Sequence, residues 1–158
     1  MRREDREIKD FDKIIEIIKK CDVCRIALND SESGYPYILP LNFGFAVNEK
    51  NLTLYFHGAT EGTKYGLLAR DERVSFEMDC EHKLFTDESR GYCTMEYESV
   101  IGRGCLEIVP DEQKYDALCT LVKQYHDSFE FNTAAIPRTT VMKLTVENMI
   151  GKARTLSV

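Results

Sequence analysis

The stretch NLTLYFHGATEGTKYGLLAR, residues 51–70, decides how the rest of the chain can fold. Its first part alternates apolar and polar residues, which predicts a half-buried β-strand over residues 52–57. Gly58 and Ala59 then remove bulk where the strand ends, and Thr60 is a suitable N-cap for a short helix. The stretch therefore predicts a strand, a tight corner and a helix.

Three residues at the start of that helix suggest a site for an anion. Backbone N–H groups in a first helical turn have no helical partner, and the helix dipole favours negative charge there. Gly62 lets a phosphate approach, Thr63 can donate a hydrogen bond and Lys64 adds charge. His57 is expected to face the same cavity. On spacing alone, an ordinary turn with a surface lysine is the more frequent arrangement, and the Walker A spacing is absent.

Composition predicts one globular domain over residues 1–158, with an N-terminal arm at 1–10 and a C-terminal tail at 151–158. The chain is 43% hydrophobic and 30% charged, which is ordinary for a folded domain. Its formal net charge is −6, from 21 Lys plus Arg and 27 Asp plus Glu, and no basic run occurs, so no nucleic-acid partner is expected. No apolar stretch is long enough to span a membrane, and the first residues do not form an apolar signal segment. We therefore expect a cytoplasmic protein that does not insert into membranes.

The six cysteines are expected to be reduced thiols, several of them in the core. Cys21 and Cys24 form a C-x-x-C pair, but they lie where a helix ends and a strand begins, and no second pair completes a zinc set. Cys80 and His82 share one strand face, and two ligands do not make a metal site. We therefore predict packing roles for these residues and no metal site.

The remaining segments predict a mainly β protein with some α-helix. Further strands are expected at residues 23–28, 35–47, 73–79, 92–109 and 141–146, further helices at residues 11–20 and from 110 onward, and a polar loop at 81–91. Pro36 and Pro40 cannot donate to a sheet ladder, so the stretch Pro40–Gly44 is expected to leave backbone groups unpaired, either beside a cavity or at a barrel corner. Glycines on both sides of Arg103 predict a bulge or a sharp bend. About six mainly antiparallel strands and three helices are expected, and the long bent strands favour a small closed barrel over a flat sheet.

Several motifs in order along the chain resemble a known family. They are Met1-Arg-Arg-x-Asp-Arg-x-Ile, Cys21-x-Val-Cys24-Arg-Ile-Ala-Leu28, Pro36-Tyr-Ile-Leu-Pro-Leu-Asn-Phe-Gly44, Leu54-Tyr-Phe-His-Gly-Ala59, Glu61-Gly-x-Lys64 and Tyr97-x-Ser-Val-Ile-Gly102. Together they resemble the Nim family, linked to 5-nitroimidazole resistance, within the pyridoxamine 5'-phosphate oxidase-like superfamily. The resemblance covers nearly the whole chain.

This resemblance implies a split-barrel homodimer that binds FMN at its subunit interface. Backbone around Leu41, Asn42 and Phe43 would face the flavin ring. His57, Gly58 and Ala59 would lie beside the ring and ribityl chain, while Gly62, Thr63 and Lys64 would take the phosphate. The second subunit would contribute Ser99 and Val100.

The sequence also departs from the superfamily's pattern in two places. The tryptophan-and-arginine signature of pyridoxamine-phosphate oxidase proper is missing, and the chain contains no Trp, so oxidation of pyridoxamine phosphate is not expected. Gly58 stands where relatives often have serine, which removes one polar contact.

Three functions remain open from the sequence. The first is an FMN-dependent oxidoreductase that reduces a small electron-poor acceptor, with His57 as the catalytic residue nearest to it. For His57 the alternative is a structural hydrogen bond beneath the flavin. The second is a non-catalytic flavin or haem carrier, in which His57 could be an axial ligand. The third is a purely structural dimer, which would give the Gly62–Lys64 corner no purpose.

Overall fold

The computed structural model describes residues 3–126 and 131–155. Its strands are β1 (Glu7–Ile8), β2 (Cys24–Leu28), β3 (Tyr37–Leu41), β4 (Phe43–Asn48), β5 (Asn51–Gly58), β6 (Arg73–Asp87), β7 (Tyr92–Ile108) and β8 (Thr140–Arg154). Its α-helices are α1 (Phe11–Lys20), α2 (Thr63–Leu68) and α3 (Lys114–Lys123), and its 3-10 turns are η1 (Glu4–Arg6), η2 (Glu88–Arg90), η3 (Asp111–Gln113) and η4 (Thr133–Arg138).

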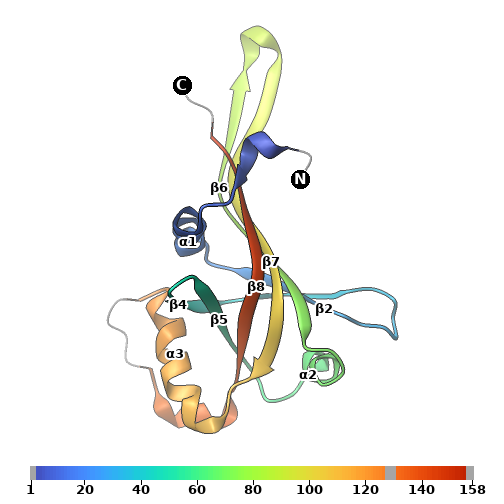
Figure 1. The fold of residues 1–158 in the computed structure, drawn as a ribbon, viewed down its shortest axis with the longest axis vertical. Coiled ribbons are helices and arrows are strands. Elements are labelled where there is room, and N and C mark those ends of the chain that lie inside the picture. Colours follow the sequence, from blue (N-terminus) through green and yellow to red (C-terminus); the bar gives the residue numbers. More distant parts are fainter. Residues whose placement is uncertain (1–2, 127–130, 156–158) are drawn as a thin grey trace.

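The strands form one antiparallel sheet that curls but does not close (Figure 1). Its order is β3-β2-β6-β7-β8-β5-β4, and β1 pairs with β8 beside this path. The two end strands, β3 and β4, follow each other in the chain and are joined through Asn42. The split-barrel class that the resemblance implies is confirmed, whereas the closed barrel expected from the bent strands is wrong because the end strands β3 and β4 do not pair. The described residues form eight strands where the sequence predicted about six.

The predicted strand at residues 35–47 is divided into β3 and β4, which belong to opposite ends of the sheet. β3 pairs with β2, and β4 pairs with β5. Pro40 lies on an edge strand, where its missing N–H breaks no interior ladder. The predicted bend is therefore the point at which the chain passes from one sheet edge to the other.

The prediction of a loop at residues 81–91 is wrong. β6 and β7 continue past a bulge at residues 80–83 and pair as far as Asp87 and Tyr92, forming a hairpin that stands away from the barrel (Figure 1). We call residues 83–96 the arm. Leu84 and Met95 on it are exposed, so no buried face imposes the alternation from which strands are predicted.

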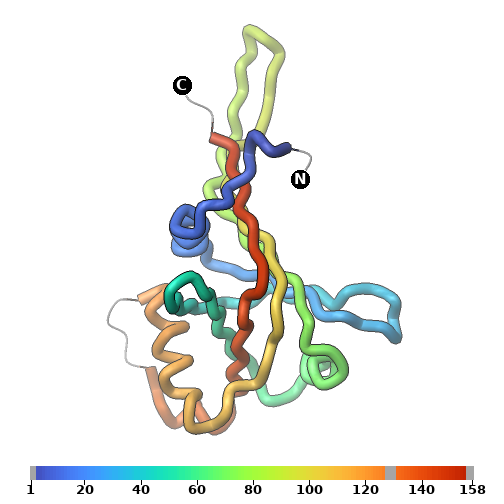
Figure 2. The backbone as a smooth tube through the Cα atoms, in the orientation of Figure 1, coloured from blue at the N-terminus to red at the C-terminus, as the bar shows by residue number. Residues whose placement is uncertain are grey.

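The two chain ends are more ordered than expected. Glu7 and Ile8 of the predicted arm at 1–10 pair with Lys152 and Gly151, and β8 runs on to Arg154 through the predicted tail (Figure 2). Residues 156–158 of that tail lie outside the described residues. The predicted bulge is confirmed, because the register between β7 and β8 shifts between Arg103 and Gly104.

The helices cover different parts of the barrel. α1 begins at Asp10, whose side chain accepts a hydrogen bond of 3.0 Å from the Lys13 N–H, and its isoleucines enter the main core. α3 packs against β4 so closely that a Cβ on Gly44 would lie 2.3 Å from Leu121 Cα. A smaller core forms beneath α3 from Val109, Ala117, Leu118 and Val141.

Candidate functional site

The corner between β5 and α2 is formed by a glycine and a partly buried lysine. α2 begins at Thr63 with Gly62 as its N-cap, at a φ of 140° that favours glycine, and no side chain caps it. The expectation that Thr60 caps this helix is therefore wrong. α2 has only six residues. Its dipole is correspondingly small, so attraction of an anion at this corner depends mainly on Lys64.

Lys64 lies over the end of β5. Its Nζ is 4.3 Å from the centroid of the Tyr65 ring, and the Tyr65 hydroxyl donates to the Ala59 carbonyl. A Cβ built on Gly58 would lie 3.3 Å from this Nζ, so the space where a serine would project is partly filled by the lysine. Gly58 therefore permits the lysine to approach the strand.

Strand register brings part of the expected ring-binding segment towards this corner. Phe43 at the start of β4 pairs with Phe56, the residue before His57, whereas Leu41 at the end of β3 pairs with Cys24 on β2. The Phe43 side chain is fully buried in the core, which leaves only its backbone to face a ligand. The register therefore brings Phe43 close to His57, while Leu41 is paired at the other edge of the sheet.

Tyr125, which follows α3, was not predicted for this site. Its hydroxyl accepts a 2.8 Å hydrogen bond from the Phe43 N–H and donates one of 2.9 Å to the Asp22 carbonyl. Asn42 Nδ2 also donates to the Asp22 carbonyl, at 3.3 Å. The expectation of unpaired backbone at residues 40–44 is therefore wrong for Phe43. Only tertiary packing brings Tyr125 here, so no local sequence signal identifies this role.

His57 points away from Lys64, contrary to the expectation that both face one cavity. Neighbouring residues on a strand point to opposite faces, and Gly58 faces the lysine. His57 instead lines a cavity of about 340 Å³ between β5, α3 and η4. The imidazole remains accessible to solvent, but burial against this cavity wall lowers the pKa of His57 below its ordinary 6.5. At neutral pH it is therefore uncharged.

Ser99 and Val100 do not join this site within one chain. Val100 pairs with Gly151 on β8, whereas Gly58 pairs with Thr140, eleven residues earlier on the same strand. At about 3.3 Å per residue, these positions lie roughly 36 Å apart along β8. The Val100 side chain is also fully buried.

The cysteine pair belongs to the core. Cys21 and Cys24 are both buried, and loss of hydration raises the pKa of each thiol well above its ordinary value. His82 contacts Asp79 at 2.8 Å on the outer face of the sheet. Among residues 3–126 and 131–155, no three His, Cys, Asp or Glu side chains gather where they could hold a metal ion.

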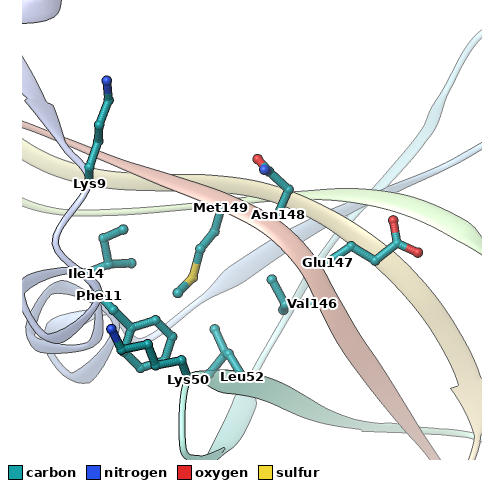
Figure 3. Close-up of a pocket in the computed structure, with 9 residues that line it drawn as sticks. All are labelled: Lys9, Phe11, Ile14, Lys50, Leu52, Val146, Glu147, Asn148 and Met149. Carbon is teal, nitrogen blue, oxygen red and sulfur yellow. The ribbon is translucent and has the colours of Figure 1, made fainter.

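A second hollow, of about 210 Å³, lies between α1, β5 and β8 (Figure 3). Phe11, Ile14, Leu52 and Met149 are among its apolar lining residues, and Lys50 also lines it (Figure 3). It contains none of the predicted site residues. In the described part of the chain, none of the helices combines the length and apolar character needed to cross a bilayer.

Comparison with known proteins agrees with this architecture. Residues 10–153 match the family described as pyridoxamine 5'-phosphate oxidase. A proposed 5-nitroimidazole antibiotic resistance protein from Bacteroides thetaiotaomicron is 33% identical, with a TM-score of 0.79 over 93% of this chain and 86% of that one. No curated protein matches.

Two more distant solved structures share the fold. The FAD and haem binding protein from Mycobacterium smegmatis is 17% identical, with a TM-score of 0.79 over 96% of this chain and 74% of that one. A flavocytochrome from Azotobacter vinelandii is 18% identical, with a TM-score of 0.77 over 99% of this chain and 72% of that one. The family match over nearly the whole chain and the 33% identical relative together show that this protein belongs to the pyridoxamine 5'-phosphate oxidase family.

Proposed function

We propose that this protein is an FMN-dependent oxidoreductase that reduces a small electron-poor acceptor. The observation that supports the proposal is the register of β4 on β5, which pairs Phe43 with Phe56 at the strand end that leads into the Gly62–Lys64 corner. The name of the 33% identical relative supports a nitro compound as the acceptor.

The corner fits the phosphate end of FMN. Lys64 supplies positive charge, and the N–H groups of Thr63 and Lys64 in the first turn of α2 can donate to an anion, whereas the Tyr65 N–H already donates to the Gly62 carbonyl. Gly58 leaves a cradle at the strand end that a Cβ would narrow, since that atom would contact the lysine at 3.2–3.3 Å. These residues offer the phosphate both a counter-charge and hydrogen bonds.

When bound, the flavin supplies the electron chemistry, and the protein supplies orientation and a defined environment. Tyr125 fixes the backbone at Phe43 through its hydroxyl and leaves the Asn42 segment to border the ring. His57, uncharged at neutral pH, can accept or donate one hydrogen bond to an acceptor, or deliver a proton in its protonated form. These residues would position the flavin and the acceptor and supply a proton, but they would carry no electrons.

We also propose a homodimer with the flavin at its interface. Ser99 and Val100 are too far from the corner to act in their own chain, so a second copy would have to bring them. Ile101 beside them is exposed on the outer face of the sheet, next to a shallow apolar hollow that also includes Ile150. Sedimentation of the flavin-loaded protein as a monomer would refute this assembly.

The test of the flavin is an absorbance spectrum of the purified protein, with the released cofactor identified by mass. Flavin bands with the mass of FMN are expected. The protein would then be reduced chemically without oxygen and mixed with a nitroaromatic acceptor. Return of the oxidised flavin band on mixing supports the oxidoreductase, and a band that stays bleached contradicts it.

A non-catalytic flavin or haem carrier is the second candidate. It is supported by the haem and flavin named for the two more distant structures, although their likeness extends only to the fold. The same spectrum separates the candidates, because haem gives a Soret band. A haem band that shifts when His57 is replaced would favour the carrier.

A further inference from the structure

Basic side chains gather where the arm joins the barrel. The two described ends of the chain meet beside β7 at the base of the arm (Figure 1). η1 contributes Arg6, and the end of β8 contributes Lys152 and Arg154. Tyr97 on β7 pairs with Arg154 across the ladder. We call these side chains the arm-base cluster, and its members are Arg6, Tyr92, Tyr97, Lys152 and Arg154.

Each cation of the cluster is held by a tyrosine. Lys152 Nζ lies 5.7 Å from the centroid of the Tyr97 ring, and Arg154 Cζ lies 6.0 Å from the centroid of the Tyr92 ring. Lys152 and Arg6 donate hydrogen bonds to the Tyr97 hydroxyl, and Arg154 donates one to the Tyr92 hydroxyl. A phenol hydroxyl is a neutral partner, so these contacts position the cations without cancelling their charge.

Carboxylates leave most of this positive charge uncancelled. Neither Lys152 nor Arg154 forms an ion pair with another described residue. Arg6 lies 3.9 Å from Asp5, and that carboxylate is held more closely by Arg3, at 2.6 Å. The cluster is therefore a positive patch on a chain whose formal net charge is −6.

The ionisation of Tyr97 reflects the same positive charge. Partial burial opposes its ionisation, but the hydrogen bonds from Lys152 and Arg6 outweigh that effect and lower the pKa of the Tyr97 hydroxyl below its ordinary 10.0. Glu98, the next residue on β7, points to the other face of the strand, where it pairs with Lys20 at 2.7 Å. The surroundings of Tyr97 thus favour a negatively charged oxygen atom at this place.

Phosphate groups suit this arrangement. Arginine and lysine bind phosphate oxygens through charge-assisted hydrogen bonds, and cations from separate elements can share a ligand that carries more than one phosphate. The Tyr92 side chain is 41% exposed and lies beside the Arg154 guanidinium, so a flat ring can stack on either group. A nucleotide combines linked phosphates with such a ring.

We propose that the arm-base cluster binds the phosphate groups of a nucleoside di- or triphosphate, with the base against Tyr92. The inference goes beyond the proposed function and does not rest on it. At about 3.3 Å per residue, Lys152 lies roughly 40 Å along β8 from Thr140, the partner of Gly58 at the flavin corner. The cluster and the flavin corner of one chain are therefore separate sites.

The test compares ADP, adenosine and pyrophosphate, each titrated by calorimetry at low salt into the purified protein. ADP should bind about tenfold or more tightly than adenosine, which has no phosphate, and added salt should weaken its binding. Pyrophosphate should bind, but more weakly than ADP, because it has no ring. Absence of ADP binding, or equal binding of adenosine, would overturn the phosphate site. Pyrophosphate that bound as tightly as ADP would overturn the contact with Tyr92.

Substitutions locate the site. Lys152→Ala and Arg154→Ala each remove one partly exposed charge, so ADP should bind about threefold to fivefold more weakly, and about tenfold or more weakly to the double variant. Tyr92→Leu should weaken ADP and leave pyrophosphate unchanged. Lys50→Ala and Arg90→Ala, at exposed turns away from the cluster, are the matched controls and should bind ADP as wild type does.

The remaining outcomes separate this inference from the proposed function. Unchanged ADP binding in the folded double variant would place the nucleotide elsewhere and overturn the site. Equal loss of FMN and ADP would also overturn it, because the cluster would then serve the flavin of a partner subunit. If the purified protein bound no flavin, the proposed function would fail, whereas the same titrations would still decide the arm-base site.

Discussion

The two faces of β5 at its end differ in chemistry although they are formed by consecutive residues. On one face Gly58 lies beneath Lys64 in a corner that offers charge and backbone donors. On the other, His57 borders a cavity beneath α3 and η4 whose described lining residues are mostly apolar. Strand alternation therefore gives the two sides of one short segment different chemical surroundings.

The largest effect is expected from Gly44→Ala. This substitution tests whether α3 packs tightly against β4 and so fixes the wall of the cavity beside His57. The added Cβ would lie 2.3 Å from Leu121 Cα and 2.5 Å from the Thr120 carbonyl oxygen, and backbone cannot rotate away. We expect the free energy of unfolding to fall by about 3 kcal/mol, the upper end for overpacking. Urea denaturation provides the measurement.

Gly66→Ala is the matched control for Gly44→Ala, because a Cβ there meets nothing within 4 Å. In helix α2 it should be neutral or stabilising by up to about 1 kcal/mol. A loss of less than about 1 kcal/mol in Gly44→Ala would mean that α3 can shift, and that the cavity is not fixed by this contact.

Lys64→Ala tests the other face. Hydrogen bonds to charged groups contribute about 1.5–3 kcal/mol, so FMN should bind roughly tenfold to a hundredfold more weakly. Riboflavin, which lacks the phosphate, should bind as before. Paired titrations of both ligands give the answer, with Lys83→Ala on the arm as control. Equal losses for the two flavins would show that Lys64 supports the ring pocket instead.

Tyr125→Phe tests whether the hydroxyl that accepts from the Phe43 N–H affects the flavin site as well as stability. Removal of the hydroxyl leaves the Phe43 N–H without its 2.8 Å acceptor, so we expect a loss of about 1 kcal/mol in stability and a shift in the bound flavin's visible spectrum. Tyr35→Phe, at a position that is 77% exposed, should do neither. Loss of stability with an unaltered spectrum would limit Tyr125 to a structural role.

The smallest effect concerns the protonation of His57. Its folded-state pKa is lowered by burial, so the unfolded chain binds more protons between the two values. This contribution to stability is complete above pH 6.5 and is lost as the pH falls through the lowered pKa. The difference in unfolding free energy between wild type and His57→Gln should not vary with pH above pH 6.5. Below that pH, wild type should lose stability relative to His57→Gln. A flat difference throughout would contradict the lowered pKa.

Local patterns in the sequence predicted the elements that have a buried face. The periodic isoleucines and Asp10 predicted α1 over its observed range, and alternation predicted β5. The arm was missed because it is solvated on both faces, so its sequence lacks the alternation of a half-buried strand. The pairing of β1 with β8 was missed because two residues carry no periodic signal.

What the sequence by itself determined is a mainly antiparallel β fold, the bend between β3 and β4, and the glycine–lysine corner after β5. These depend on local chemistry: alternation, prolines that cannot donate, and a glycine with a positive φ. Only the tertiary structure decided that His57 faces away from Lys64, that Tyr125 pairs with the Phe43 N–H, and that α3 and η4 enclose a cavity. Those relations join segments up to 82 residues apart, and they depend on packing between side chains that no local pattern connects.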